Sequence, residues 1–259
     1  MGVPKKHLGE WRSIEFELIL KNYKYLDEFK SFIKKKKYEQ FVNIQNDGSI
    51  HATPQNCKKC WSCINYPSAK CYALTTGHLP KEIAVSYRKG QENIIYDVCE
   101  FFSGKAYVNQ SCGTHVHFDM RHVDRNIARA YGSRLACAVP ALKQLIPRWR
   151  RSNEFCYDTI NWLNDRGSDD PYNEDKYAFI NLLAYDKHQT IEVRGHAGTL
   201  DADTILNWIE VCEIVMFTEK TVSSTTVKDL KKHYSLNKKL LNYIAKRVKS
   251  TKKLNFVET

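Results

Sequence analysis

Hydrophobic and polar residues alternate over several stretches of the chain, as expected of β-strands that bury one face. The stretches are residues 11–20, 38–45, 79–87, 114–120 and 189–196, and residues 179–185, which are more uniformly apolar, also resemble a strand. We predict a strand for each of them. The tripeptide NDG at 46–48 is a strong turn signal and predicts the end of the second strand.

Apolar residues recur at helical spacing in the segments between these strands. The segments are residues 22–37, 91–104, 124–146 and 201–217, and two short basic helices are predicted after residue 219. Gly104 is suited to end the second helix and Asp124 to begin the third. Strands and helices mixed in this way predict an α+β domain around a largely antiparallel sheet.

The composition is that of a globular protein. The chain has 259 residues, 42% hydrophobic and 12% aromatic, enough to bury a core as one domain or two small ones. No apolar run approaches the roughly 20 residues of a membrane span. The opening sequence MGVPKKHLGEWRS has no apolar signal core, so we expect a cytoplasmic protein without a membrane partner. Nine cysteines in such a chain favour thiols or metal ligands over disulfides.

The positive charge is concentrated at the C-terminal end. The formal net charge is +11, and residues 219–259 hold 11 Lys/Arg against 3 Asp/Glu, which leaves about +3 for the rest. This basic tail is either a solvated helical face or a contact for nucleic acid or another anionic macromolecule.

One face of several predicted strands is rich in carboxylates, imidazoles and arginine. Side chains at i and i+2 of a strand share a face and lie about 6.6 Å apart, while the residue between them points to the other face. Apolar residues occupy that other face around residues 15–17, 115–119 and 192. The polar face holds Glu15, Glu17, Glu82, His115, His117, Asp119, Glu192 and Arg194.

Such a face suits metal ions and phosphate, although an ordinary solvent-facing sheet would also be polar. Carboxylates from different strands are the ligands that Mg²⁺ and Mn²⁺ prefer, and an imidazole fits Mn²⁺. His115, His117 and Asp119 could instead surround a hydrolytic Zn²⁺. Arg194, two residues from Glu192, favours phosphate, because a guanidinium pairs phosphate oxygens bidentately. Metals, arginine and phosphate together are typical of phosphoryl transfer.

Five segments in a fixed order resemble a known family. They are IEFEL near the N-terminus, NDGSI at 46–50, the strand around Glu82, CGTHVHFD at 112–119 and TIEVRGHAGTLDADTILNWIEVC at 190–212. The chain resembles the amidoligase family of the carboxylate–amine ligase superfamily, which is similar to glutamine synthetase and glutamate–cysteine ligase. The resemblance covers roughly residues 10–217. Its most specific part is Glu-x-Arg followed by a Gly-Thr-Leu-Asp turn and a helix carrying Trp208.

The resemblance implies a glutamine synthetase-like fold, with a curved, largely antiparallel sheet, the active site on its concave face and helices on its convex side. It also implies ATP-dependent, ADP-forming joining of a carboxylate to an amine through an acyl phosphate. ATP and Mg²⁺ or Mn²⁺ would be the cofactors. The substrates implied are an acid and an amine, which could be an amino acid, a peptide, a protein side chain or a modified nucleobase.

The resemblance also implies roles for individual residues. Arg194 would stabilise the transferring phosphoryl group, and Glu82 would join it in the catalytic set. His117 would contact the nucleotide, and Gly113 would permit its close approach. The implied metal ligands are Glu15, Glu17, Glu82, His115 and Glu192.

Other residues keep two interpretations. Asp47 is either a turn residue or a substrate or metal group. Arg148, Arg150 and Arg151 lie on a solvated surface or bind phosphate or carboxylate, and the family also tends to be polar at Tyr177 and Asn181.

Two features depart from the family pattern. The segment after Glu82, EIAVSYRKG, lacks the Ser-Pro that the family often has there. A Cys-rich insert at about 55–73 places Cys57, Cys60, Cys63 and Cys71 at zinc-knuckle spacing, although unliganded thiols or an iron–sulfur cluster would also fit. We therefore expect a catalytic domain over residues 1–218 that contains the insert, followed by a basic helical extension over 219–259.

Two other functions fit parts of the sequence. A zinc knuckle and a basic tail would suit a nucleic-acid-binding module on a degenerate ligase fold. A metal-dependent hydrolase would use the histidine-rich strand. Arg194 beside Glu192 separates these readings, since an ATP-using enzyme needs it and a hydrolase does not.

Overall fold

The computed structural model describes residues 10–50, 78–151, 156, 177–219 and 221–254. The chain divides into two compact units. The N-terminal unit contains the described residues of Ser13–Thr114 and Gly198–Ala202. The C-terminal unit contains residues 10–12, the described residues of His115–Ala197, and those from Asp203 onward.

Helices and strands are mixed along the chain, and the strands form an open antiparallel sheet, which confirms the α+β class. The strands are β1 (Trp11–Leu20), β2 (Val42–Gln45), β3 (Leu79–Arg88), β4 (Ala106–Tyr107), β5 (Gly113–Asp119), β6 (Ile180–Asn181) and β7 (Thr190–Ala197). The helices are α1 (Lys24–Lys36), α4 (Asn93–Phe102), α5 (Arg125–Leu142), α7 (Leu183–His188), α8 (Ala202–Phe217), α9 (Val227–His233) and α10 (Lys238–Leu254), with 3-10 turns η1 (Lys143–Leu145) and η2 (Arg148–Arg150). The glutamine synthetase-like form of the sheet stays a prediction.

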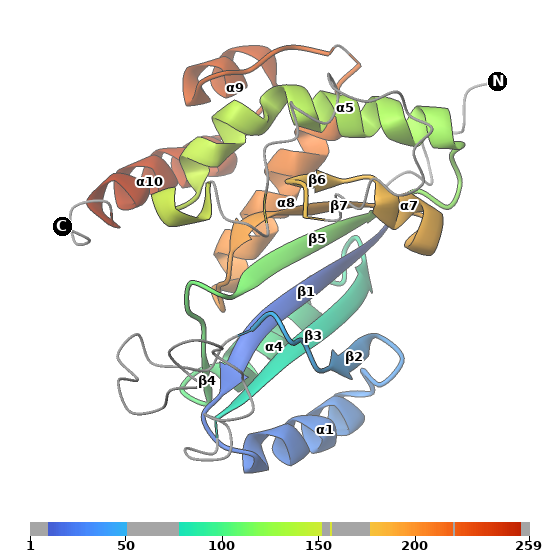
Figure 1. Ribbon diagram of the computed structural model, residues 1–259, viewed down its shortest axis with the longest axis vertical. Coiled ribbons are helices and arrows are strands. Elements are labelled where there is room, and N and C mark those ends of the chain that lie inside the picture. Colours follow the sequence, from blue (N-terminus) through green and yellow to red (C-terminus); the bar gives the residue numbers. More distant parts are fainter. Residues whose placement is uncertain (1–9, 51–77, 152–155, 157–176, 220, 255–259) are drawn as a thin grey trace. The chain divides into compact units, whose positions relative to one another are not determined.

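In the N-terminal unit the strand order is β2-β3-β1, and β4 pairs with the end of β1 (Figure 1). The pairing of β2 with β3 runs from Val42 opposite Val85 to Gln45 opposite Glu82. Alternate apolar residues of β1 are buried, as the sequence pattern predicts. Helices α1 and α4 add aromatic packing, with the rings of Phe29 and Phe102 centred 4.5 Å apart.

In the C-terminal unit the strand order is β5-β7-β6. Val116 of β5 and Val193 of β7 are fully buried, as is Trp208 of α8. The Trp208 ring lies 5.1 Å from the ring of His196. Gly195 of β7 lies so close to Phe179 that a Cβ built on it would be 2.0 Å from the Phe179 ring. Position 195, between Arg194 and His196, therefore requires glycine, because any larger residue would clash with the Phe179 ring.

The C-terminal helices pack within the same unit. The Asp124 side chain accepts a hydrogen bond from the Ile127 N–H at 2.9 Å, which confirms the predicted N-cap of α5. Ahead of α9, the Ser224 N–H donates to the Cys137 carbonyl of α5 at 3.0 Å. Arg247 of α10 donates from Nε to the Leu145 carbonyl at 3.1 Å. The basic tail is thus held to α5 and the turn after it.

Two predicted strands are shorter than the sequence pattern indicated. In the stretch 179–185 only Ile180–Asn181 is a strand, because Asn181 Oδ1 accepts the Leu183 N–H at 3.0 Å and the chain turns into α7. In the stretch 38–45 the strand starts at Val42. Lys37 ends α1 in a left-handed conformation (φ 60°), and the Tyr38 N–H returns to the Ile33 carbonyl at 2.8 Å.

The final helix is longer than predicted, since α10 has 17 residues. In the described part of the chain, no helix combines the length and apolar character needed to cross a membrane.

Candidate functional site

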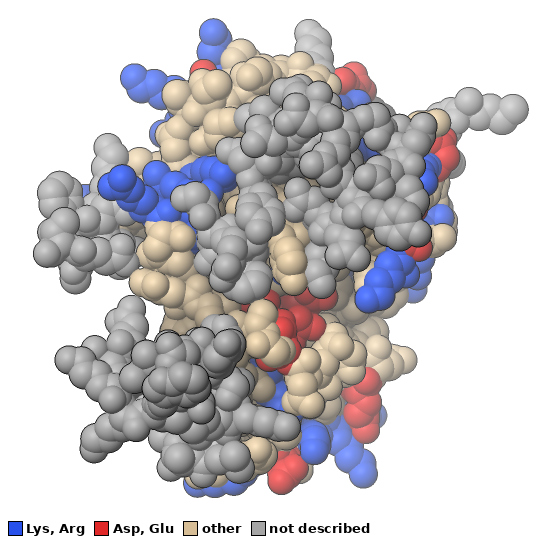
Figure 2. All heavy atoms as spheres, viewed as in Figure 1, with Lys and Arg blue, Asp and Glu red and all other residues tan. Residues whose placement is uncertain are grey.

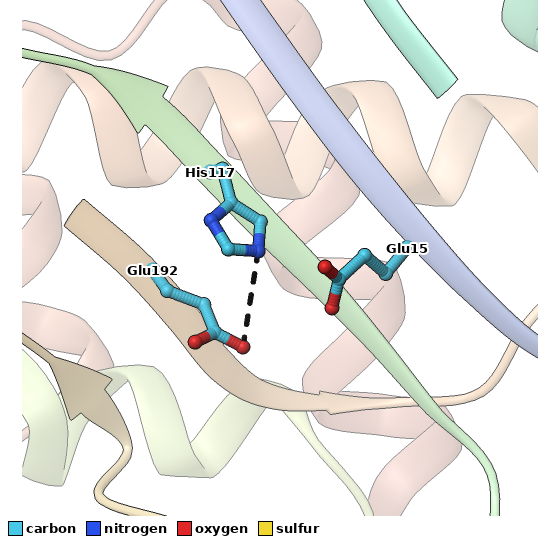
Figure 3. A group of neighbouring side chains, drawn as sticks. All are labelled: Glu15, His117 and Glu192. Atoms are coloured by element: carbon cyan, nitrogen blue, oxygen red, sulfur yellow. Dashed lines mark ion pairs between the residues drawn. The ribbon is translucent and has the colours of Figure 1, made fainter. Parts of the chain in front are cut away.

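The C-terminal unit gathers a carboxylate and two imidazoles on neighbouring strands. Figure 3 shows His117 of β5 with its Nε2 facing the Glu192 carboxylate of β7, and the distance to Oε1 is 3.9 Å. His115 Nδ1 lies 3.6 Å from the same oxygen. His115 is 1% exposed and Glu192 is 4% exposed. The polar face of these strands is therefore a buried cluster rather than a solvent-facing surface.

The strand period places these side chains. Val116 and Phe118, which alternate with the histidines on β5, are fully buried on the opposite face. On β7, Ile191 and Val193 flank Glu192 in the same way. The face that the sequence pattern assigned to the polar residues is thus the face they occupy.

Asn181 supports Glu192 from the edge strand β6. The two residues are partners in the β6–β7 register, and Asn181 Nδ2 donates to Glu192 Oε2 at 2.6 Å. The Asn181 side-chain oxygen also accepts the N–H of Leu183, the first residue of α7. One buried amide therefore holds the Glu192 carboxylate and fixes the turn into α7.

Arg194 completes the group around Glu192. Its Nη1 donates to Glu192 Oε1 at 2.5 Å, and its guanidinium lies 5.8 Å from the Tyr177 ring centre. The Arg194 side chain keeps 15% of its surface exposed, so it is the more accessible partner of the pair. A guanidinium that is partly accessible beside a buried carboxylate can bind a further anion.

The three arginines of RWRR have different positions. Arg150 is 1% exposed, and its Nη2 donates to the Arg194 carbonyl at 3.2 Å, so it supports the β7 backbone. Arg148 is exposed. Burial and the nearby charge of Arg148 lower the pKa of Arg151, whose Nε donates to the Ile146 carbonyl at 3.1 Å. Of the three, Arg150 is the one in contact with the strand that carries the site.

Two neighbours of His117 were not singled out from the sequence. Thr190 Oγ1 lies 3.0 Å from His117 Nδ1, and the exposed His188 ring lies edge-on to it at 6.2 Å between centres. The Thr190 contact leaves Nε2 of His117 turned toward Glu192. Strand alternation could have predicted that Thr190 lies near the site, because it is two residues before Glu192 and shares its face.

Asp119 is held by a neighbour on its own strand end. Arg121 donates to its two carboxylate oxygens at 2.8 and 2.7 Å, and the Arg121 N–H adds a third bond at 3.0 Å. Burial would raise the pKa of Asp119, but the hydrogen bonds and charge of Arg121 outweigh burial and lower it. This carboxylate is committed to Arg121, which weakens the hypothesis of a zinc triad with His115 and His117.

The N-terminal unit contains a separate cluster of three carboxylates. Glu17 of β1, Glu82 of β3 and Asp47 after β2 each offer an oxygen, and these oxygens lie within 4.8 Å of one another. Glu17 is buried, and the other two are partly buried. The Gly113 N–H donates to the Glu17 carboxylate. The role seen for Gly113 is therefore to hold a candidate metal ligand, and its contact with a nucleotide stays a prediction.

Asp47 is a turn residue that also lies in the candidate metal cluster, and its metal role stays a prediction. Its Oδ1 accepts from the Ser49 N–H and hydroxyl, each at 2.7 Å, which closes the predicted turn. The same carboxylate belongs to the cluster with Glu17 and Glu82. The turn therefore brings a third acid to the two strand carboxylates.

Glu15 lies on the same face of β1 as Glu17 and is partly buried; it is the third residue labelled in Figure 3. Its metal role stays a prediction. The cysteine cluster of Cys57, Cys60, Cys63 and Cys71 lies outside the described residues, so its zinc site also stays a prediction.

The other cysteines mostly fill the core, as predicted. Four of them, Cys99, Cys112, Cys156 and Cys212, are buried, and Cys137 is partly buried. Burial, with a smaller contribution from Asp201, raises the pKa of the Cys99 thiol to about 12. Such thiols are unreactive packing residues.

His196 is a buried histidine behind the site. Its Nδ1 lies 2.7 Å from the Ala197 carbonyl, and the residue is 1% exposed. Burial, together with the charges of Arg247 and Arg150, lowers the pKa of His196 to about 3. The imidazole is therefore neutral at physiological pH and serves packing rather than proton transfer.

Comparison with known proteins agrees with the resemblance noted in the sequence. The model of a family described as putative amidoligase enzyme matches residues 102–216. This span contains His115, His117, Glu192 and Arg194 and ends before α9. None of the curated proteins compared with the chain matches it. The match agrees with the predicted resemblance to amidoligases over these residues and suggests an enzyme, a ligase of some kind.

Proposed function

We propose that this chain is an ATP-dependent, ADP-forming carboxylate–amine ligase that makes an amide bond through an acyl phosphate. The match of residues 102–216 to putative amidoligases supports the ligase class. The finer mechanism rests on the chemistry of the two clusters described above.

The observation that carries the proposal is the pair of Glu192 and Arg194, joined at 2.5 Å on the face that also holds two buried histidines. A hydrolytic metal site gains little from a guanidinium beside its ligand. An enzyme that transfers a phosphoryl group needs one, because charge on the phosphoryl oxygens must be stabilised as the group moves.

The N-terminal cluster supports the metal requirement. Three carboxylates whose oxygens lie within 4.8 Å repel one another, and an oxygen-preferring divalent cation removes this repulsion. Glu17, Asp47 and Glu82 are the residues that would hold Mg²⁺ or Mn²⁺ there, with His115 and Glu192 as the ligands proposed for a second ion. Bound ions would neutralise phosphate charge.

The proposed reaction has two steps. In the first, a carboxylate oxygen of the acid attacks the γ-phosphorus of ATP, the bond to the bridging oxygen breaks, and ADP leaves. In the second, the amine nitrogen attacks the acyl carbon, the bond to phosphate breaks, and the nitrogen loses a proton. Arg194 would pair with the phosphoryl oxygens in the first step, while Asn181 and Thr190 keep Glu192 and His117 oriented.

The test is ADP formation that depends on an acid. The purified chain is incubated with ATP, Mg²⁺ or Mn²⁺, and separate pools of amino acids, peptides, a protein and nucleosides carrying a carboxylate or amine. We expect ADP and phosphate with at least one pool, and an amide product by mass spectrometry. Hydroxylamine in place of the amine should trap the acyl phosphate as a hydroxamate.

A pair of variants tests the site itself. Arg194→Gln should lower kcat by about 10²–10³-fold, since it removes a donor to the transferring group. Arg148→Gln removes the same charge from an exposed position and should leave the rate unchanged. Full activity in the Arg194 variant would refute this site. ATP hydrolysis with no acid-dependent product would favour a hydrolase instead.

A further inference from the structure

The last two helices carry a set of lysines that face solvent. Residues 221–254 contain a single acidic residue, Asp229. Its side chain forms the capping box at the start of α9 with Thr226. Figure 2 shows blue side chains gathered at the upper left, where Figure 1 places α9 and α10. The exposed lysines, called here the lysine surface, are Lys228, Lys231, Lys232, Lys238, Lys239, Lys246 and Lys249.

Packing holds the lysine surface on a fixed frame. Leu240, Tyr243 and Ile244 of α10 are buried, and Thr251 Oγ1 donates to the Gln144 carbonyl at 3.3 Å. These residues recur at helical spacing, so the opposite side of α10 is left to lysine. On α9, Leu230 is buried in the same way.

The helix α1 provides a contrast within the same chain. It is also rich in lysine, but its charges are partly matched: Lys36 pairs with Asp97 at 2.8 Å and Lys30 with Asp27 at 3.3 Å. Among the described residues, no acid forms an ion pair with any lysine of the lysine surface.

Unmatched lysines at helical spacing lower the stability of the helices that hold them. Lys228 lies three and four residues before Lys231 and Lys232, and Lys246 lies three before Lys249. Like-charge pairs of this kind are destabilising at low salt. A bound polyanion would reverse the sign of this effect, because it neutralises the charges that repel.

The surface chemistry identifies the class of polyanion. The large hydrophobic residues that are exposed in the described chain are Tyr23 and Tyr96, and both are in the N-terminal unit. Tyr234, directly after α9, and Tyr243 of α10 are buried. The lysine surface therefore lacks the aromatic and aliphatic anchors of a protein interface or a membrane-inserted helix. Repeated ammonium groups alone suit a polymer with evenly spaced phosphates.

We propose that α9 and α10 bind the phosphate backbone of a nucleic acid through the lysine surface, without reading its bases. The contact is electrostatic and independent of the ligase reaction. It would hold the enzyme near a nucleic acid or near a substrate carried on one.

The test measures binding of a mixed-sequence DNA duplex to the full chain as a function of salt. Each phosphate neutralised contributes about −0.9 to the slope of log K against log salt, so seven contacts would weaken binding by 10³–10⁴-fold between about 50 and 200 mM. The variant with Lys231, Lys232, Lys246 and Lys249 changed to Gln should reduce the slope by about 3–4.

A matched control removes the same charge from α1, by changing Lys24, Lys30, Lys34 and Lys35 to Gln. We expect the control to keep the wild-type slope and affinity. Equal loss in both variants would show a response to net charge alone and overturn the proposal, as would wild-type binding by the lysine-surface variant. Tighter binding to anionic vesicles or to polyglutamate than to DNA at equal salt would also overturn it.

A footprint makes the result independent of whether the variant folds. The wild-type chain is acetylated with and without duplex DNA, and modified lysines are mapped by mass spectrometry. DNA should protect the lysine surface several-fold more than the α1 lysines. Equal protection of the two sets would contradict the proposal.

Discussion

Asn181 is the residue whose replacement most directly tests the buried cluster. Its amide donates to Glu192 at 2.6 Å, and its side-chain oxygen accepts the Leu183 N–H at 3.0 Å where α7 begins. The substitution Asn181→Asp keeps an oxygen for the Leu183 N–H but replaces the donor to Glu192 with a second carboxylate. The variant therefore isolates the contact with Glu192 from the turn.

Two effects should lower the free energy of unfolding of the Asn181→Asp variant. Loss of a hydrogen bond to a charged acceptor costs about 1.5–3 kcal/mol. Two carboxylates at this distance repel strongly, since unit charges 4 Å apart interact by about 4 kcal/mol at an effective dielectric of about 20. The pair relieves this repulsion by binding a proton, so the pKa of the introduced pair rises above that of an unfolded carboxyl.

The sign of the pH dependence follows from this shift. A carboxyl pair with a raised folded pKa binds more protons when folded, so its stability is fully present at low pH and is lost as pH rises through the folded pKa. We expect Asn181→Asp to lower the free energy of unfolding by about 1.5–3 kcal/mol near pH 5 and by about 3–5 kcal/mol near pH 8.

Urea unfolding at the two pH values measures this difference. Asn43→Asp, an exposed change on β2, is the matched control and should alter stability by less than about 0.5 kcal/mol. An equal loss at pH 5 and pH 8 would refute the account, because a missing hydrogen bond alone does not depend on pH in this range.

Three further changes test other parts of the structure. Gly195→Ala should destabilise the chain by about 2 kcal/mol or more in thermal unfolding, because the added Cβ would lie 2.0 Å from the Phe179 ring. The control Gly48→Ala places its Cβ where no atom lies within 4 Å, so it should change the stability little. Asp47→Asn should weaken Mn²⁺ binding at least about tenfold, as measured by calorimetry or electron paramagnetic resonance, whereas Asp27→Asn on α1 should leave the affinity unchanged. Equal Mn²⁺ affinity of the two variants would exclude the carboxylate cluster as a metal site. The pKa of His196 is lowered from 6.5 to about 3, so the unfolded chain binds a proton that the folded chain cannot, and stability should fall as pH drops below 6.5, by at most about 1.4 kcal/mol per unit. His196→Gln should remove that part of the slope in denaturant unfolding at pH 4 to 7, and an unchanged slope would contradict the burial of this imidazole.

Local periodicity predicted what depends on local backbone geometry. The alternation around Glu17, His115 and Glu192 assigned each side chain to the correct face, because neighbours in a strand point to opposite sides whatever surrounds them. It failed at residues 182–185, where apolar residues continue but the amide of Asn181 binds the backbone and starts a helix. A hydrophobic pattern does not contain that hydrogen bond.

Contacts between side chains far apart in the sequence could not be predicted from residue spacing. Asn181 was noted only as a polar position, and its contact with Glu192 depends on the register of β6 with β7. Arg150 looked like its two arginine neighbours, yet it is the one that hydrogen-bonds to β7, through the Arg194 carbonyl. The bond between Asp119 and Arg121 was local and could have been found, because an acid and an arginine two residues apart at a strand end often pair.

Burial decides between two interpretations of the polar face that the sequence left open. A solvent-facing sheet would leave its acids and histidines exposed, but His115 and Glu192 retain 1% and 4% of their accessible surface. Removing a carboxylate from water costs several kcal/mol unless it is paired and hydrogen-bonded. Asn181 and Arg194 supply that compensation for Glu192, and an apolar pair of the same size would pack there at no such cost. An arginine, a carboxylate and two imidazoles in this position cost stability, and under the function proposed above that cost serves the chemistry.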